Sequence, residues 1–171
     1  YINERSNNFS PKLGLVLGSG LGVLANDIEN PIAISYDDIP GFFNCSVAGH
    51  GGHLYLGMLK GVPVACLQGR AHFYEGISHD DVLTPMRTLR MLGCDTLIST
   101  NASGSLREEV TPGNLVLVKD HINFQFNNPL VGKNNDAFGP RFIGMEDTYD
   151  LEIRETFKRL AGELDISITE G

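Results

Sequence analysis

An apolar run and a polar loop follow one another in the segment Val62-Pro63-Val64-Ala65-Cys66-Leu67-Gln68-Gly69-Arg70-Ala71-His72-Phe73-Tyr74-Glu75-Gly76. The apolar part, Val62–Leu67, predicts a buried strand. The loop then supplies a guanidinium, an imidazole, a phenol and a carboxylate between two glycines, which permit tight turns and close backbone approach. The guanidinium suits an oxyanion, and the imidazole adds a donor. This segment alone is equally compatible with a solvated turn.

Two other apolar runs also end in small polar loops. Leu13–Leu17 precedes Gly18–Gly22, and Asp95–Thr100 precedes Asn101–Ser105. The glycine loop has the spacing G-x-G-x-G, which is neither the dinucleotide fingerprint nor the P-loop, so by itself it is a weak signal. In open α/β sheets, however, ligands bind beyond the carboxyl ends of the strands. If these strands are parallel, the three loops share one crevice.

The shared crevice would hold hydrogen-bond donors and a permanent positive charge, from Ser19, Arg70, His72 and the backbone around Ala102. Glu75 is the adjacent carboxylate, and donors with positive charge suit phosphate rather than a metal ion. The sequence contains neither the nucleophile elbow G-x-S-x-G nor the zinc motif H-E-x-x-H. We therefore expect a phosphate bound beside Tyr74, His50 and Glu75 to be itself the nucleophile, with a sugar held next to it.

The rest of the chain predicts an α/β layer structure with a mixed, largely parallel central sheet flanked by helices. Further strands are expected at Ile32–Tyr36, Asn44–Ala48, Leu54–Leu59, Asn114–Val118 and Ile166–Thr169. One helix should run from a cap at Asp80 to about Leu92, with Pro85 near its first turn and Gly93 as its stop. A second should run from Thr148 to about Ala161 and stop at Gly162. Loops as long as Phe124–Gly144 are usually functional or interfacial.

The composition restricts the class of protein. The 171 residues suffice for a single α/β domain, residues 1–171, and the net charge of −8 argues against a nucleic-acid partner or an anionic membrane surface. No apolar run approaches the length of a membrane span, and no signal peptide is recognisable. The three cysteines, Cys45, Cys66 and Cys94, lack metal or redox spacing, which favours reduced thiols in a cytoplasmic protein. The chain begins with Tyr1, so we expect translation to start upstream.

Five segments carry a family resemblance by their order and approximate spacing: Gly18-Ser19-Gly20-Leu21-Gly22, Gly49-His50-Gly51-Gly52, Gly69–Gly76, Thr100-Asn101-Ala102-Ser103-Gly104 and Asp120-His121-Ile122-Asn123. Together they resemble the successive motifs of the trimeric purine nucleoside phosphorylases, from about Leu13 to Gly171. The resemblance implies phosphorolysis of purine ribonucleosides or deoxyribonucleosides to the base and the sugar 1-phosphate. It implies inorganic phosphate as co-substrate, with no metal and no organic cofactor.

The resemblance also implies a role for each site residue. Phosphate would be held by Ser19, Arg70, His72 and the amide of Ala102, and a ribose hydroxyl by Tyr74. His50 would lie close to the phosphate, and Glu75 would orient His50 or the phosphate. Asn101 would shape the loop on the base side. Phe142 would reach the sugar pocket of a neighbouring subunit, which makes the long loop interfacial and the enzyme a homotrimer.

Two departures from the family pattern affect these expectations. Ser103 stands where the family usually has alanine, close to the expected base. The family also continues beyond the position of Gly171, with a further phosphate-binding serine, the base-recognising glutamate and asparagine, and a histidine near the sugar 5′ position. We therefore expect this chain to be the amino-terminal two-thirds of a longer phosphorylase domain, poorly active alone. Hypoxanthine, guanine and xanthine stay open as the base.

Two alternatives stay open. The methylthioadenosine phosphorylases share the glycine loop and a segment like Gly104–Glu109, but they carry Gly-Arg-His-Gly in place of Gly69-Arg70-Ala71-His72. The second alternative is an anion-binding or oligomerisation module without catalysis. Turnover of inosine with phosphate would exclude this second alternative.

Overall fold

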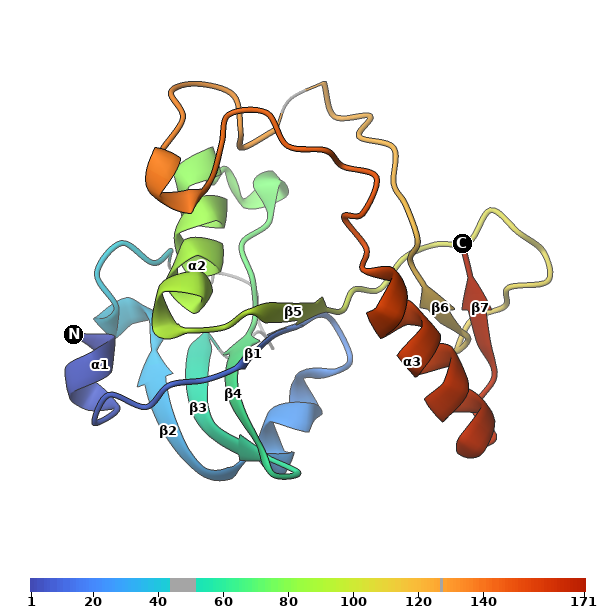
Figure 1. The fold of residues 1–171 in the computed structure, drawn as a ribbon, viewed down its shortest axis with the longest axis horizontal. Coiled ribbons are helices and arrows are strands. Elements are labelled where there is room, and N and C mark those ends of the chain that lie inside the picture. The colour runs from blue at the N-terminus through green and yellow to red at the C-terminus, as the bar shows by residue number, and fades with distance from the viewer. Residues whose placement is uncertain (44–51, 127) are drawn as a thin grey trace. The chain divides into compact units, whose positions relative to one another are not determined.

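The computed structural model describes residues 1–43, 52–126 and 128–171 (Figure 1). By its internal contacts the chain divides into two compact units, Tyr1–Ala102 and Ser103–Gly171. The single domain expected over residues 1–171 stays a prediction. The α/β class with a mixed sheet is confirmed.

The first unit contains a five-stranded sheet in the order β2-β3-β4-β1-β5. Its strands are β1 (Leu13–Leu17), β2 (Glu29–Ser35), β3 (His53–Leu59), β4 (Val62–Gln68) and β5 (Thr96–Ser99). β1 lies between β4 and β5 and is parallel to both, whereas β3 is antiparallel to β2 and β4. The three strands that precede the polar loops are therefore neighbours in the sheet. The strand expected at Asn44–Ala48 lies outside the described residues.

The sequence of β4 is a nearly continuous apolar run because both faces of this strand are buried. Ala65 and Leu67 belong to one core cluster, which includes Leu89 of helix α2 (His79–Leu92). Val64 and Cys66 belong to the other cluster, together with Ala25 of the 3₁₀ turn η1 (Gly22–Asp27). Figure 1 shows α2 beside the sheet of this unit. Burial of each large aliphatic side chain contributes roughly 1.5–3 kcal/mol.

Helix α2 begins at a different cap from the one expected. Ser78 caps it: its Oγ accepts from the Asp81 N–H at 3.3 Å, and the Asp81 carboxylate accepts from the Ser78 N–H at 2.7 Å. These bonds from Ser78 hold the pKa of Asp81 below its usual value. The expectation that Asp80 caps the helix is wrong. The two reciprocal bonds between Ser78 and Asp81 form a capping box, which starts the helix ahead of the periodic apolar residues from which its beginning was predicted. Gly93 ends the helix as expected, with φ +114°.

We expect Ser78→Ala to lower the free energy of unfolding by about 1 kcal/mol, because an N-cap hydroxyl is lost. Asp80→Ala should have a smaller effect, since Asp80 supplies no cap. Urea denaturation of both variants measures the difference. A larger loss for Asp80→Ala than for Ser78→Ala would contradict the assignment of the cap.

The second unit contains a parallel pair, β6 (Leu115–Leu117) and β7 (Ile168–Glu170), and helix α3 (Leu151–Glu163). Asp150 caps α3, and its side chain accepts from the Ile153 N–H at 2.9 Å. The stop expected at Gly162 is wrong, because the helix continues to Glu163 with Leu164 as its C-cap. A glycine adds flexibility to a helix but does not by itself end one.

An ion-pair network joins α3 to β7. The carboxylate of Glu170 pairs with Arg154 and, at 3.4 Å, with the Lys158 amine. The bond from Arg154 is the largest cause that lowers the pKa of Glu170.

Among the described residues of the long segment 124–144, the regular element is the short 3₁₀ turn η4 (Asp136–Phe138), so the expected long loop is confirmed. The described residues of the first unit also form the short helical turns α1 (Ile2–Arg5), η2 (Tyr36–Asp38) and η3 (Phe73–Glu75).

Two of the cysteines are buried thiols. Cys66 and Cys94 are free of disulfides, and burial raises the pKa of Cys66 to about 12 and of Cys94 to about 11. They therefore stay protonated and pack as small apolar residues, as expected. Cys45 lies outside the described residues. None of the helices in the described part of the chain has the length and apolarity that crossing a membrane requires.

Candidate functional site

The carboxyl ends of β1, β4 and β5 lie at one edge of the sheet. The strands are parallel and in register, with Leu17 opposite Gln68 and Val16 opposite Ser99. The glycine loop, the arginine loop that begins at Gly69, and the turn into Asn101 all leave the sheet there. The condition set in the sequence analysis for a shared crevice, that these strands are parallel, is met.

Hydrogen bonds through Thr100 join the three loops. The Gly18 N–H donates to the Thr100 Oγ1 at 2.9 Å, and this hydroxyl donates to the Val16 carbonyl at 3.2 Å. Arg70 donates from Nη1 to the Thr100 carbonyl at 2.5 Å. The half-buried guanidinium after β4 is thereby attached to the end of β5.

The glycine loop passes very close to the end of β5 at Gly18. A Cβ on Gly18 would lie 2.4 Å from the Thr100 carbonyl oxygen and 2.9 Å from the Asn101 Cα. Both are backbone atoms, which cannot rotate away as a side chain could. Gly18 is thus required by space, whereas Gly20, with φ +85°, has open space around it.

Buried hydroxyl and amide groups hold the start of the arginine loop. Gly69 is buried with φ +101°, and its carbonyl accepts from the Tyr36 hydroxyl at 2.8 Å. Next to it, Gln68 donates from Nε2 to the Gly22 carbonyl at 2.9 Å, while its Oε1 accepts from the Tyr55 hydroxyl at 3.3 Å. The bond from Tyr36 to Gly69 fixes the turn that leads to Arg70. The bond from Gln68 to Gly22 ties the glycine loop to β4.

We expect Tyr36→Phe to lower the free energy of unfolding by about 1–2 kcal/mol, because the buried Gly69 carbonyl loses a donor. The aromatic ring stays, so its edge-to-face contacts with Phe42 and Phe43 are kept. Denaturant titration measures the loss, and Tyr55→Phe is the matched control with a longer bond in a less buried place. An unchanged midpoint for Tyr36→Phe would contradict the prediction.

The other polar groups of the arginine loop bond to one another. The Glu75 Oε2 accepts from the His72 N–H, and the Glu75 N–H donates to the His72 carbonyl, both at 2.9 Å. The His72 ring stacks on Tyr74, with centroids 4.8 Å apart and planes at 15°. The Glu75 carboxylate thus supports the backbone that carries His72. Its expected action on His50 is a prediction, because His50 lies outside the described residues.

The remaining candidate residues are exposed. Ser19, Asn101 and Ala102 lie on loops at the common edge, where Asn101 Nδ2 donates to the Ala102 carbonyl at 3.5 Å. Ser103 and Phe142 belong to the second unit, and the Phe142 side chain is 89% exposed. The structure therefore brings Ser19, Arg70, His72, Tyr74, Glu75, Asn101 and Ala102 to one edge of the first unit. Within the described ranges, no group of three or more His, Cys, Asp or Glu side chains could hold a metal ion.

Sequence reasoning missed Thr100, Gln68, Tyr36 and Tyr55 as parts of the site. Tyr36 bonds a residue 33 positions away, and Thr100 bonds Gly18 across 82 positions. A single sequence contains no local pattern that predicts a contact between residues so far apart. The position of Thr100 at the end of an expected strand was the available signal.

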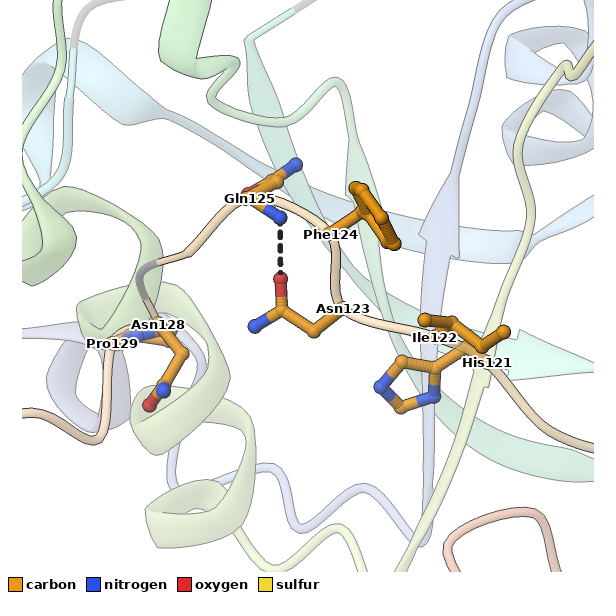
Figure 2. Close-up of a pocket in the computed structure, with 7 residues that line it drawn as sticks. All are labelled: His121, Ile122, Asn123, Phe124, Gln125, Asn128 and Pro129. Carbon is orange, nitrogen blue, oxygen red and sulfur yellow. Dashed lines mark hydrogen bonds between the residues drawn. The ribbon is translucent and has the colours of Figure 1, made fainter.

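The second unit has a hollow of about 270 Å³ of its own, lined by residues 121–125 together with Asn128 and Pro129. Figure 2 shows these side chains, with the Asn123 Oδ1 accepting from the Gln125 N–H at 3.0 Å. His121 shares a hydrogen bond of 3.1 Å between its Nδ1 and the Tyr149 hydroxyl. The hollow lies on the motif Asp120-His121-Ile122-Asn123, and none of the residues of the three loops lines it.

A glycine loop, an arginine and exposed backbone gather at the carboxyl edge of parallel strands in an α/β protein. Residues 12–171 match the family model described as the phosphorylase superfamily, and the chain belongs to this superfamily. Within it, the relatives are purine nucleoside phosphorylases, the family that the motifs resembled.

The comparisons cover nearly all of this chain but only part of each relative. Purine nucleoside phosphorylase 1 of Bacillus subtilis is 48% identical over 162 residues, which are 95% of this chain and 60% of that protein. A crystal structure of isoform 2 of the Schistosoma mansoni enzyme, in complex with cytosine and ribose-1-phosphate, matches with a TM-score of 0.93 and 40% identity, over 100% of this chain and 61% of that one. Another S. mansoni structure, in complex with inosine, matches with a TM-score of 0.92 and 38% identity, over 99% of this chain and 61% of that one. The chain thus spans about three-fifths of the length of these proteins.

Proposed function

We propose that the chain forms the phosphate- and sugar-binding part of an enzyme that phosphorolyses purine (2′-deoxy)ribonucleosides to the purine base and (deoxy)ribose 1-phosphate. The observation that carries this proposal is the joining of three loops at one strand edge, with Arg70 bonded to the Thr100 carbonyl. The bound ribose-1-phosphate and inosine of the S. mansoni proteins support the class of substrate.

Phosphate is held by donors from all three loops. Arg70 uses Nη1 on Thr100, and the rest of its planar, positively charged fork faces the anion. The Ser19 hydroxyl, His72 and the Ala102 amide complete the set. Charge-assisted bonds of this kind are about twice as strong as neutral ones.

The reaction follows from placing phosphate below the sugar. As the bond between C1′ and the purine nitrogen stretches, its electron pair leaves with the base and the sugar gains oxocarbenium character. A phosphate oxygen stabilises this charge and then bonds to C1′ with inversion, while the proton of hydrogen phosphate ends on the base. Oriented proximity of the two substrates can lower the barrier by roughly 7–11 kcal/mol, and fixed donors add electrostatic stabilisation.

The other candidates act on the sugar and the base. Tyr74, stacked on His72, binds a ribose hydroxyl, and Glu75 keeps this turn in place. His50, which is outside the described residues, is assigned a role near the phosphate by the family motif alone, and Asn101 and Ser103 are assigned to the base side. Phe142 enters the sugar pocket of a neighbouring copy, so the active form is a homotrimer. The enzyme acts in the cytoplasm and needs no metal and no organic cofactor.

The test is phosphorolysis of inosine by the natural protein, after its intact mass has been measured. We expect release of hypoxanthine and ribose 1-phosphate that depends on added phosphate. Turnover on methylthioadenosine alone would assign the related phosphorylase class instead. Phosphate binding without turnover would leave an anion-binding module, and a mass near 18.6 kDa with no turnover would mean a true fragment.

A further inference from the structure

We infer that Thr100 is a positioning residue of the phosphate site, which sets the glycine loop and Arg70 at their working separation. The inference rests on the proposed function, since it assumes that the three loops bind phosphate. Thr100 itself is not expected to touch phosphate or sugar. Its role is to fix the groups that do.

The first step of the argument concerns the hydroxyl. At the end of β5, the Thr100 N–H donates to the Val16 carbonyl at 2.9 Å, and its Oγ1 donates to the same carbonyl at 3.2 Å. The hydroxyl also accepts from the Gly18 N–H at 2.9 Å. One side chain therefore bonds both a donor and an acceptor of the neighbouring strand end, directly before Ser19.

The second step concerns the carbonyl of the same residue. It accepts from Arg70 Nη1, so the direction of the guanidinium depends on the orientation of the peptide after Thr100. That peptide also leads into Asn101 and Ala102. The hydroxyl holds this backbone against β1 by its hydrogen bonds, and the carbonyl, fixed in this way, determines the position of the Arg70 guanidinium.

The third step concerns space. The Thr100 carbonyl oxygen occupies the place where a Cβ on Gly18 would be, only 2.4 Å away. The glycine loop and the end of β5 are therefore in close backbone approach, and a hydrogen bond at this point controls their separation. Displacement of a positioning group by about 1 Å can cost about 100-fold in rate.

The test compares three variants of the natural protein. Thr100→Val keeps the branched shape and removes the hydroxyl, and Thr100→Ser keeps the hydroxyl. Thr88→Val is the matched control, because the Thr88 hydroxyl bonds the Thr84 carbonyl at 2.8 Å inside α2. For each protein the KM for inorganic phosphate and kcat are measured with saturating inosine, and phosphate binding is measured by calorimetry.

We expect Thr100→Val to weaken phosphate binding and raise the KM for phosphate by about 10- to 100-fold, as a displaced positioning group would. Thr100→Ser should restore both values to within about threefold of the unchanged protein, and Thr88→Val should change neither. If Thr100→Val does not fold, Thr100→Cys replaces it, because a thiol is a poor hydrogen-bonding group. Its KM for phosphate should then exceed that of Thr100→Ser.

Each outcome bears on the inference. If a folded Thr100→Val or Thr100→Cys variant binds phosphate as tightly as the unchanged protein, the role of Thr100 is overturned and the proposed function stands. A loss of thermal stability with an unchanged KM for phosphate would likewise reduce Thr100 to a sheet-stabilising residue. If the unchanged protein binds no phosphate, the proposed function and this inference fail together.

Discussion

Gly18→Ala is expected to abolish measurable phosphate binding and to destabilise the protein. The new methyl carbon would lie 2.4 Å from the Thr100 carbonyl oxygen and 2.9 Å from the Asn101 Cα. Because both neighbours are backbone atoms, relief requires β1 and β5 to separate where the loops leave the sheet. Overpacking of this kind costs about 1–3 kcal/mol, which for a chain of this size lowers the melting temperature by roughly 2–4 °C for each kcal/mol.

Gly22→Ala is the matched control in the same loop. A Cβ on Gly22 would meet Gln68 at 3.6 Å, an ordinary contact with a movable side chain. Its melting temperature and phosphate affinity should stay close to those of the unchanged protein. Calorimetry of all three proteins makes the comparison, and equal behaviour of the two variants would contradict the close approach at Gly18.

Arg70→Lys is expected to weaken phosphate binding by about 10- to 100-fold, although the positive charge is kept. A lysine cannot donate to the Thr100 carbonyl and to phosphate with the fixed geometry of a guanidinium fork. A hydrogen bond to a charged group contributes about 1.5–3 kcal/mol, which sets the expected range. The KM for phosphate and the binding constant from calorimetry both measure the effect.

Arg90→Lys separates this effect from a general cost of losing an arginine. Arg90 also donates through Nη1 to a backbone carbonyl, that of Cys94, at 3.3 Å. Cys94 lies before the amino end of β5, at the opposite end of that strand from Thr100. We expect unchanged phosphate affinity for Arg90→Lys, and an equal loss in both variants would argue against a phosphate role for Arg70.

The strands and their polar loops were predictable because they depend on local patterns. β1 and β4 are apolar runs in the sequence because each strand contributes residues to both core clusters, Val16 and Leu17 from β1 and Leu67 and Cys66 from β4. The sequence-based predictions that the structure contradicts concern the ends of the helices. Ser78 rather than Asp80 caps α2, and α3 continues through Gly162, because end points depend on individual hydrogen bonds rather than on periodicity.

The amino-acid sequence alone was sufficient for the class of fold and for the family, and it suggested the residue types of the proposed anion site, because motifs and hydrophobic patterns lie in contiguous stretches. The sequence did not reveal that Thr100 joins Gly18 to Arg70, or that Tyr36 holds Gly69. These bonds link residues 30 to 82 positions apart. The bonds of Thr100 form because parallel pairing places β1 between β4 and β5, and the bond of Tyr36 forms because antiparallel pairing places β3 between β2 and β4. The exact positions of the site's donors are therefore a property of the packed sheet, where backbone contact distances are set by strands that meet only after folding.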